Sequence, residues 1–174
     1  NWREQNAASN RPIWIAASTH ADPTGGESEE SLILEAHQSL LKNHPDALLI
    51  LVPRHEARFD EVADLINSSG LDWQRRTEGQ TLSNKTNVYL ADTLGEMMLW
   101  YAAADIAFVG GSLVPFGGHN ILEPAALQKP ILSGPHYSNL ESMFKPFQEQ
   151  KAITLCENSA DLSKQLELYI DHAE

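Results

Sequence analysis

Short apolar segments alternate with longer segments of helical periodicity along the whole chain. The segment ALLILVP, residues 47–53, is apolar without alternation. This pattern is typical of a strand buried on both faces, as in a parallel sheet. Similar short apolar runs recur along the chain, and they predict strands at residues 12–18, 47–53, 87–92, 105–111, 129–134 and 152–156.

The segments between these runs have the spacing of amphipathic helices. An apolar residue recurs every fourth position at residues 32, 36 and 40, and again at residues 162, 166 and 170. Further helices are predicted over residues 56–68, 94–103, 121–127 and 137–150, and the polar segment 77–86 is a predicted loop. The alternation predicts one α/β domain over residues 1–174: a Rossmann-like fold with about six parallel strands, right-handed crossovers and helices on both faces.

Composition agrees with one soluble globular domain. The chain has 174 residues, of which 42% are hydrophobic and 21% charged. No apolar run approaches the roughly 20 residues of a membrane span, and no segment resembles a signal peptide. The single cysteine, Cys156, excludes an internal disulfide and fits a reducing compartment. Because the chain begins at Asn1 rather than Met, we expect a fragment of a longer protein.

The charge balance limits the possible partners. Twelve basic and 24 acidic residues give a formal charge of −12. Such a field repels nucleic acid and anionic lipid, so neither is an expected partner of this domain. An anionic ligand would need a local binding device, such as an arginine or a helix N-terminus.

Glycine, proline, histidine and arginine concentrate directly after the predicted strands, where parallel sheets bind their ligands. The segment GGHNILEP, Gly117 to Pro124, follows one strand and begins a helix. One interpretation is a phosphate cradle: the glycines admit a ligand to the backbone, and Glu123 accepts hydrogen bonds from ribose hydroxyls. The other is a capping box, with Asn120 as N-cap and Glu123 three residues later. The two interpretations are compatible.

Three more segments follow strands in the same way. Arg54 comes directly after the most apolar strand and could pair with a phosphate, although it could equally be a surface arginine. Leu94, Gly95 and Glu96 could meet a nucleobase, or form an ordinary connection in which Asp92 or Thr93 caps the next helix. The loop that begins at Ser18 could close over a ligand, or simply be solvated.

Other chemistries lack their motifs. The sequence contains no Asp-x-Asp, no H-E-x-x-H, no G-x-S-x-G and no G-x-x-x-x-G-K-[ST]. One cysteine cannot build a zinc site, and the glycines of GGSLVPFGG do not match G-x-G-x-x-G. We therefore predict no metal site, no bound cofactor and no dinucleotide site.

The segments FVGGSLVPFGGHNILEPAALQKPILSGPH, LILVPRH, IAASTH and NVYLADTLGEMMLWYAAADIAFVGGS together closely resemble the 3-deoxy-D-manno-octulosonic acid (Kdo) transferases of lipopolysaccharide synthesis. The matches run in order from about Ile13 to His136, and the combined pattern is highly specific. The resemblance implies the C-terminal, donor-binding half of a GT-B glycosyltransferase. It also implies transfer of Kdo from CMP-Kdo to a lipid A precursor at the cytoplasmic face of the bacterial inner membrane.

The resemblance also implies which residues contact the CMP moiety. Matching the family's motifs residue by residue gives Pro53, Arg54, Leu94, Gly95, Glu96, Asn120, Ile121, Leu122 and Glu123, with weaker support for Ser18, Gly117, Gly118 and His119. We expect Arg54 and the amides near residues 118–120 to stabilise the negative charge of the CMP leaving group.

In this family the catalytic base is a glutamate of the N-terminal domain, which also carries the acceptor site and the membrane anchor. We therefore expect no catalytic residue in this chain, and a soluble, cytosolic domain that is inactive alone, with membrane contact through the rest of the protein. The alternatives are a GT-B relative that uses a UDP-sugar, either a transferase or an epimerase, and a nucleotide-binding module without catalysis.

Overall fold

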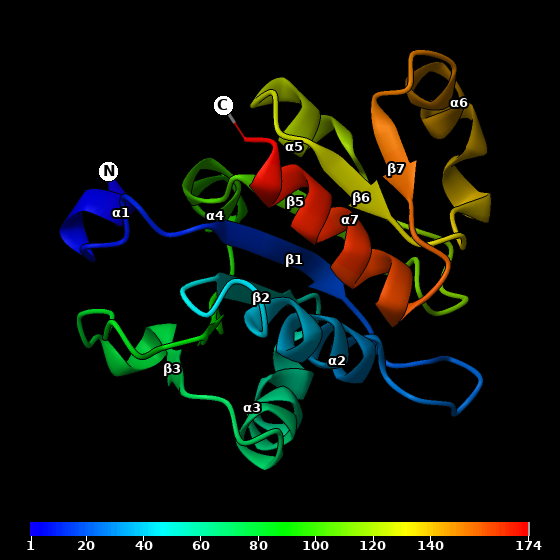
Figure 1. Ribbon diagram of the computed structural model, residues 1–174. Helices are drawn as coiled ribbons and strands as arrows, with labels where there is room; N and C mark the ends of the chain where they lie inside the picture. The colour runs from blue at the N-terminus through cyan, green and yellow to red at the C-terminus, as the bar shows by residue number, and fades with distance from the viewer. Residues whose placement is uncertain (174) are drawn as a thin grey trace.

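The computed structural model describes residues 1–173 and shows one parallel sheet of seven strands (Figure 1). The strands are β1 Ile13–Thr19, β2 Leu48–Pro53, β3 Trp73–Arg75, β4 Val88–Leu90, β5 Ile106–Val109, β6 Ile131–Ser133 and β7 Ile153–Leu155. Their order is β3-β4-β2-β1-β5-β6-β7, and every pairing is parallel. Strands β2, β3 and β4 lie on one side of β1, and β5, β6 and β7 lie on the other side. The strand order therefore reverses between β1 and β5.

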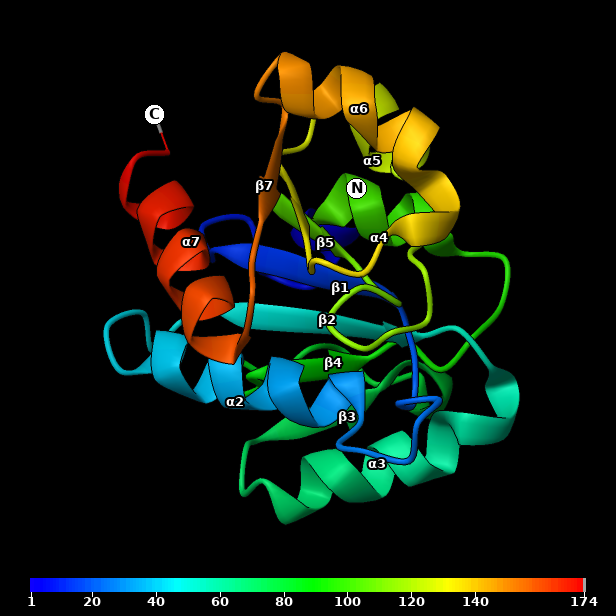
Figure 2. The same ribbon diagram turned by 90° about the vertical axis from the view of Figure 1, so that its right-hand side faces the viewer.

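Helices cover both faces of the sheet (Figures 1 and 2). Helices α2 Glu29–Leu41, α3 Phe59–Ser68 and α7 Ser159–Asp171 pack on one face. Helices α1 Trp2–Gln5, α4 Met97–Ala103, α5 Leu122–Ala126 and α6 Glu141–Glu149 pack on the other. Short 3₁₀ turns lie at η1 Glu56–Arg58, η2 Arg76–Glu78 and η3 Ser138–Leu140. The predicted Rossmann-like architecture is confirmed.

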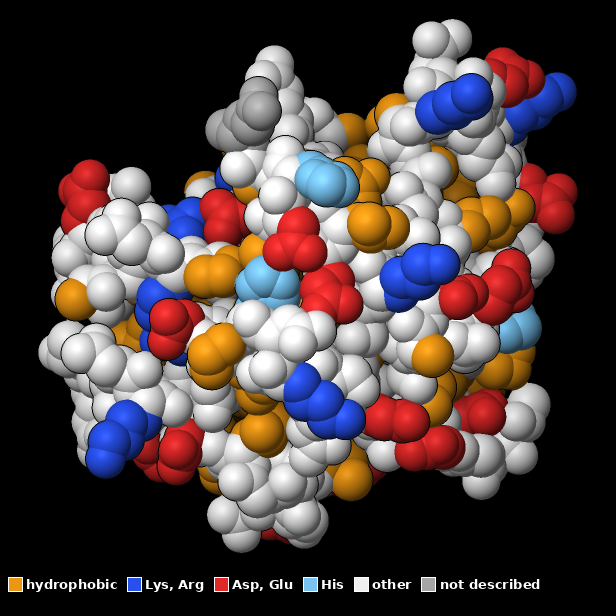
Figure 3. Space-filling view, in the orientation of Figure 1, with side chains coloured by type: hydrophobic (Ala, Val, Ile, Leu, Met, Phe, Trp, Pro, Cys, Tyr) orange, Lys and Arg blue, Asp and Glu red, His pale blue; other side chains and the backbone are white. Residues whose placement is uncertain are grey.

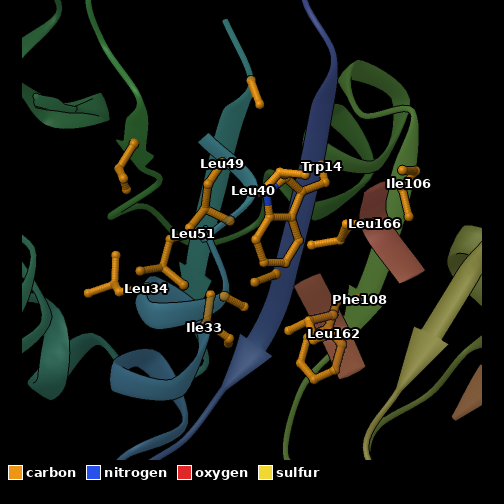
Figure 4. Close-up of a cluster of buried hydrophobic side chains, with 14 of the residues drawn as sticks. Trp14, Ile33, Leu34, Leu40, Leu49, Leu51, Ile106, Phe108, Leu162 and Leu166 are labelled. Atoms are coloured by element: carbon orange, nitrogen blue, oxygen red, sulfur yellow. The ribbon is translucent and has the colours of Figure 1, made fainter. Parts of the chain in front are cut away.

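The core on the first face is built by alternate residues of the central strands. Trp14 of β1, Leu49 and Leu51 of β2 and Phe108 of β5 point toward α2 and α7, where Leu166 and its neighbours meet them (Figure 4). Cys156 is fully buried in this same core. Burial raises the pKa of the Cys156 thiol to about 12. All six residues of β2 are buried, as its unbroken apolar run predicts.

All six predicted strands are present, and one further strand, β3, was missed. This strand has three residues, all half-buried, and pairs only with β4 at the edge of the sheet. Its sequence, Trp-Gln-Arg, is too short and too polar to produce an apolar run. The four-residue helix α1 gives no periodic signal either.

The four helices predicted at residues 56, 94, 121 and 137 all begin later than expected, at residues 59, 97, 122 and 141. Helix α4 starts at Met97 rather than at residue 94, because Gly95 adopts φ +79° and interrupts the helical backbone. Neither Asp92 nor Thr93 caps it. The Asp92 carboxylate instead accepts hydrogen bonds from Arg75 and Thr77.

In residues 1–173, no helix combines the length and apolarity that crossing a bilayer requires.

Candidate functional site

A cavity of about 360 Å³ opens at the carboxyl edge of the sheet, across the point where the strand order reverses. Segments that follow β1, β2, β4 and β5 build its wall. Its lining consists of Ser18, Val52, Pro53, Arg54, Thr93, Leu94, Gly95, Glu96, Met97, Tyr101, His119, Asn120 and Glu123. A larger cavity of about 580 Å³ lies near Pro12 and Ile106, at the amino ends of the strands, where sheets of this kind do not bind their ligands.

Most of the predicted contact residues meet at this one cavity. Its wall includes Ser18, Pro53, Arg54, Leu94, Gly95, Glu96, His119, Asn120 and Glu123. Four predicted residues do not line it. Ile121 is buried in the core beneath α6, the side chain of Leu122 is 48% exposed, and Gly117 and Gly118 are packed against the segment 136–139.

Arg54 is exposed in the cavity and forms none of the ion pairs found among residues 1–173. The neighbouring Arg58 differs, because its guanidinium pairs in bidentate fashion with the buried Glu30 carboxylate at 2.7 and 3.0 Å. Arg58 is therefore structural, whereas the Arg54 guanidinium is available for an anionic ligand.

Glu96 is held in place on the opposite wall. Its carboxylate accepts hydrogen bonds from Arg76 at 3.1 and 3.3 Å and from the Thr93 hydroxyl. The Arg76 and Thr93 hydrogen bonds lower the pKa of Glu96. This wall therefore presents a fixed, ionised carboxylate that can accept but not donate hydrogen bonds.

Glu123 and Tyr101 complete the cavity. Burial, and after it the charge of Glu123, raises the pKa of the Tyr101 hydroxyl, which stays protonated.

The predicted capping box is not formed. Asn120 Oδ1 accepts a hydrogen bond from the Leu122 amide at 2.8 Å, and α5 begins two residues after Asn120 with Ile121 in the capping position. The Glu123 side chain faces the cavity. Helix α5 has five residues, too short to supply a strong dipole.

The glycine-rich loop after β5 is organised around a carboxylate of the protein itself. Glu29, fully buried at the start of α2, accepts hydrogen bonds from four backbone amides, those of His20, Gly111, Ser112 and Leu113, at 2.7 to 3.2 Å. Burial raises the pKa of Glu29 to about 7, against the effect of these hydrogen bonds. The Gly118 amide donates to the Gly111 carbonyl at 2.9 Å. These amides are therefore already occupied by the protein itself. The cavity-lining residues of this loop are His119 and Asn120.

Three histidines gather beside the cavity. The ring of His20 stacks on Phe116, with centroids 3.7 Å apart, and lies nearly parallel to the ring of His119, with centroids 4.8 Å apart. His55 meets the His20 ring edge-on at 5.2 Å. His20 Nε2 lies 2.5 Å from His119 Nε2. Burial, followed by the neighbouring His119, lowers the pKa of His20 to about 3. Among residues 1–173, no group of three or more His, Cys, Asp or Glu side chains is placed to hold a metal ion.

Sequence reasoning missed several of these groups. Glu29 and Glu30 read as ordinary first-turn acids of a helix, a position where glutamate is common and usually exposed. His20 and Phe116 carry no motif by themselves. Tyr101 falls inside an apolar helical segment. Only the long-range contacts between the ends of β1 and β5 bring these side chains together.

The chain was compared with known proteins, and no family model matches it. It is 42% identical over 165 residues to the 3-deoxy-D-manno-octulosonic acid transferase of Haemophilus influenzae, a match that covers 94% of this chain and 37% of the relative. A probable mitochondrial 3-deoxy-D-manno-octulosonic acid transferase from Arabidopsis thaliana is 34% identical, with 93% of this chain and 36% of the relative covered. The chain therefore spans little more than a third of these relatives.

One solved structure matches almost the whole length of this chain. The crystal structure of the C-terminal CMP-Kdo binding domain of WaaA from Acinetobacter baumannii superposes with a TM-score of 0.87 at 38% identity, covering 98% of this chain and 87% of that one. This chain belongs to the Kdo transferase family. A glycosyltransferase from Rickettsia africae, 19% identical with a TM-score of 0.61 over 97% of this chain and 40% of that one, shares its fold. The chain thus has the Rossmann-like GT-B fold of that C-terminal domain.

Proposed function

We propose that this domain binds CMP-Kdo and is the donor half of an enzyme that transfers Kdo to a lipid A precursor in lipopolysaccharide synthesis. The observation that carries the proposal is the cavity at the strand-order reversal. It unites Pro53–Arg54, Leu94–Glu96, Asn120 and Glu123, which the family resemblance predicts as CMP contacts. The 38% identity to a CMP-Kdo binding domain supports the same ligand.

The chemistry of the cavity suits a nucleoside monophosphate ester. The unpaired Arg54 would bind the phosphate and stabilise the charge that develops on the CMP leaving group. The carboxylates of Glu96 and Glu123 would accept hydrogen bonds from hydroxyl or amino groups of the nucleoside. We assign no catalytic base to this chain. By family resemblance, the base, the acceptor site and the contact with the cytoplasmic face of the inner membrane belong to the N-terminal half of the full-length protein.

Isothermal titration with CMP, and with UMP and UDP for comparison, tests this assignment. CMP should bind saturably and more tightly than UMP. Arg54→Ala should weaken CMP binding roughly ten- to hundredfold, since a charge-assisted hydrogen bond is lost. Lys85→Ala removes one positive charge from an exposed position before β4, away from the cavity, and is the matched control.

Three outcomes would contradict the proposal. A preference for UDP over CMP would favour a transferase or epimerase that uses a UDP-sugar. An unchanged CMP affinity in Arg54→Ala would remove the phosphate role of Arg54. Binding of none of these nucleotides, by this chain and by the full-length protein, would overturn the donor-site assignment.

A further inference from the structure

His20 and His119 form a hydrogen-bonded pair, and the two side chains differ in solvent accessibility. The side chain of His20 is buried beneath Phe116 and beside His119, and the residue is 3% exposed. His119 is half-buried and lines the cavity next to Asn120. The two Nε2 atoms, 2.5 Å apart, share one hydrogen bond. One ring must donate this bond and the other accept it.

The orientation of the His119 ring decides which edge remains free. A Cβ placed on Gly111 would lie 3.0 Å from His119 Cδ2, 3.3 Å from His119 Nε2 and 3.1 Å from Phe116 Cδ1. The Cδ2–Nε2 edge of His119 therefore faces the glycine loop and His20. Nδ1, on the other side of the ring, forms no hydrogen bond among residues 1–173, and His119 lines the cavity.

The charges around the pair favour a negatively charged ligand. Arg54, His55 and Arg58 all act on His20 from the segment that follows β2. Of these, only Arg58 is paired, with Glu30 and Glu61. On the α2 side, both Glu29 oxygens accept backbone amides, and Glu30 binds Arg58 and Thr19.

These surroundings also keep both rings of the pair uncharged. Burial and the nearby positive charges lower the pKa of both His20 and His119. Both rings are therefore neutral at pH 7. If His20 donates from Nε2 to His119 Nε2, the single N–H proton of the neutral His119 ring is on Nδ1. His119 can then donate a hydrogen bond from Nδ1 to an anion.

We propose that His119, oriented by His20, recognises the carboxylate of an acidic sugar on the donor nucleotide. This inference rests on the proposed function. In an activated 2-ulosonic acid, the carboxylate and the phosphate oxygen are bonded to the same carbon, so the ligand presents two adjacent anions. Arg54 and His119 offer two neighbouring donors in one cavity. A nucleotide with a neutral sugar would leave the His119 donor without a partner, which disfavours it. His20 is a positioning residue that has no contact with the ligand.

The decisive quantity is the ratio of the CMP and CMP-Kdo dissociation constants, measured by titration calorimetry at pH 8. In the unsubstituted chain, CMP-Kdo should bind at least about tenfold more tightly than CMP, because one hydrogen bond to a charged group contributes about that much to affinity. His119→Ala should bring the ratio close to one. His20→Phe keeps an aromatic ring in the stack but removes the nitrogen, and should also reduce the ratio. His20→Gln keeps a donor and should restore much of it.

Imidazole ¹⁵N chemical shifts give a second readout that a purely structural role would not move. With CMP-Kdo bound, His119 should carry its proton on Nδ1 and His20 on Nε2. Thermal unfolding shows whether each variant is folded. A ratio unchanged in folded His119→Ala, or a ratio near one in the unsubstituted chain, would overturn the inference. Failure of the unsubstituted chain to bind CMP would instead count against the proposed function.

Discussion

His37 is held as a neutral side chain by two hydrogen bonds of opposite direction. The buried Trp14 Nε1–H donates to His37 Nδ1 at 3.0 Å, and His37 Nε2 donates to the Asn87 carbonyl at 2.9 Å. A proton on Nδ1 would break the first bond inside the core. Burial lowers the pKa of His37 to about 4, whereas the ordinary histidine value is 6.5.

This arrangement predicts a loss of stability in mild acid. Because the folded-state pKa lies below the unfolded value, the unfolded chain binds the proton first. The contribution of His37 is fully present above pH 6.5 and is lost as the pH falls toward about 4. The change amounts to roughly 3 kcal/mol at most. Urea denaturation at a series of pH values measures it.

His37→Gln is the matched variant, because an amide can keep both hydrogen bonds but does not titrate. Its unfolding free energy should depend less steeply on pH between 6.5 and 4. Glu29, whose pKa is raised, titrates in the opposite sense, and it cancels in the comparison because both proteins contain it. Identical pH slopes for the two proteins would show that His37 is not the titrating group.

Glu29→Gln should destabilise the fold. The carboxylate accepts two amides on each oxygen, and the glutamine amide nitrogen cannot accept from one of these pairs. Two buried donors without partners cost about 2–4 kcal/mol. Glu35→Gln, at an exposed position of the same helix, is the control in chemical denaturation. A loss no greater than that of the control would mean that the loop does not depend on this carboxylate.

At the scale of elements, Gly110, directly after β5, packs closely against the carboxyl end of β1. A Cβ at this position would lie 2.7 Å from the carbonyl oxygens of Ala17 and Ser18 and 2.7 Å from Glu29 Oε1. Ser18 itself has φ +57°, and the pairing of β1 with β2 shifts between residues 17 and 19. The carboxyl end of β1 is thus an irregular backbone segment held between the glycine loop and α2.

Gly110→Ala should therefore lower the unfolding free energy by about 1–3 kcal/mol, the usual cost of forcing extra volume into a packed site. It should also weaken CMP binding, because Ser18 lines the cavity. Gly70→Ala is the comparison, since φ is +77° there but the space is open, and it should cost about 1 kcal/mol from backbone conformation alone. Equal losses at the two positions would contradict the steric argument.

The elements also show what sequence alone could and could not predict. The six strands with clear apolar runs were found, and their order along the chain placed Arg54, Gly95 and Asn120 at one edge of the sheet. Edge strand β3 was missed because three half-exposed residues produce no pattern. The roles of Glu29 and His20 could not be predicted, because each depends on a contact with the loop after β5, some 80 to 100 residues away.

At the scale of the whole molecule, charge separates the surface from the site. Acidic side chains are spread over the face seen in Figure 3, with Lys and Arg among them, and they are not gathered in one patch. The net charge is −12. At the carboxyl edge of the sheet, the cavity is lined by the Arg54 guanidinium together with the carboxylates of Glu96 and Glu123. An anionic ligand would therefore depend on a direct contact with Arg54 and not on the net charge of the surface.

We therefore predict that this chain does not bind vesicles containing anionic lipid at moderate salt. Repulsion between like charges is screened over about 10 Å at 0.1 M salt, so the effect should be strongest at low ionic strength. Co-sedimentation with vesicles of neutral and of anionic lipid measures it. Sedimentation with the anionic vesicles would contradict our assignment of membrane attachment to the other half of the full-length protein.

The burial of Cys156 has a practical consequence for experiments on this domain. It is the only cysteine, and its thiol is fully buried and not ionised at neutral pH, so alkylating reagents should not modify it. A cysteine introduced beside the cavity but outside its lining, for example Met98→Cys at a residue that is 47% exposed, would then be the only accessible thiol. A fluorophore attached there would report donor binding directly in the folded protein, without removal of a native residue from the core.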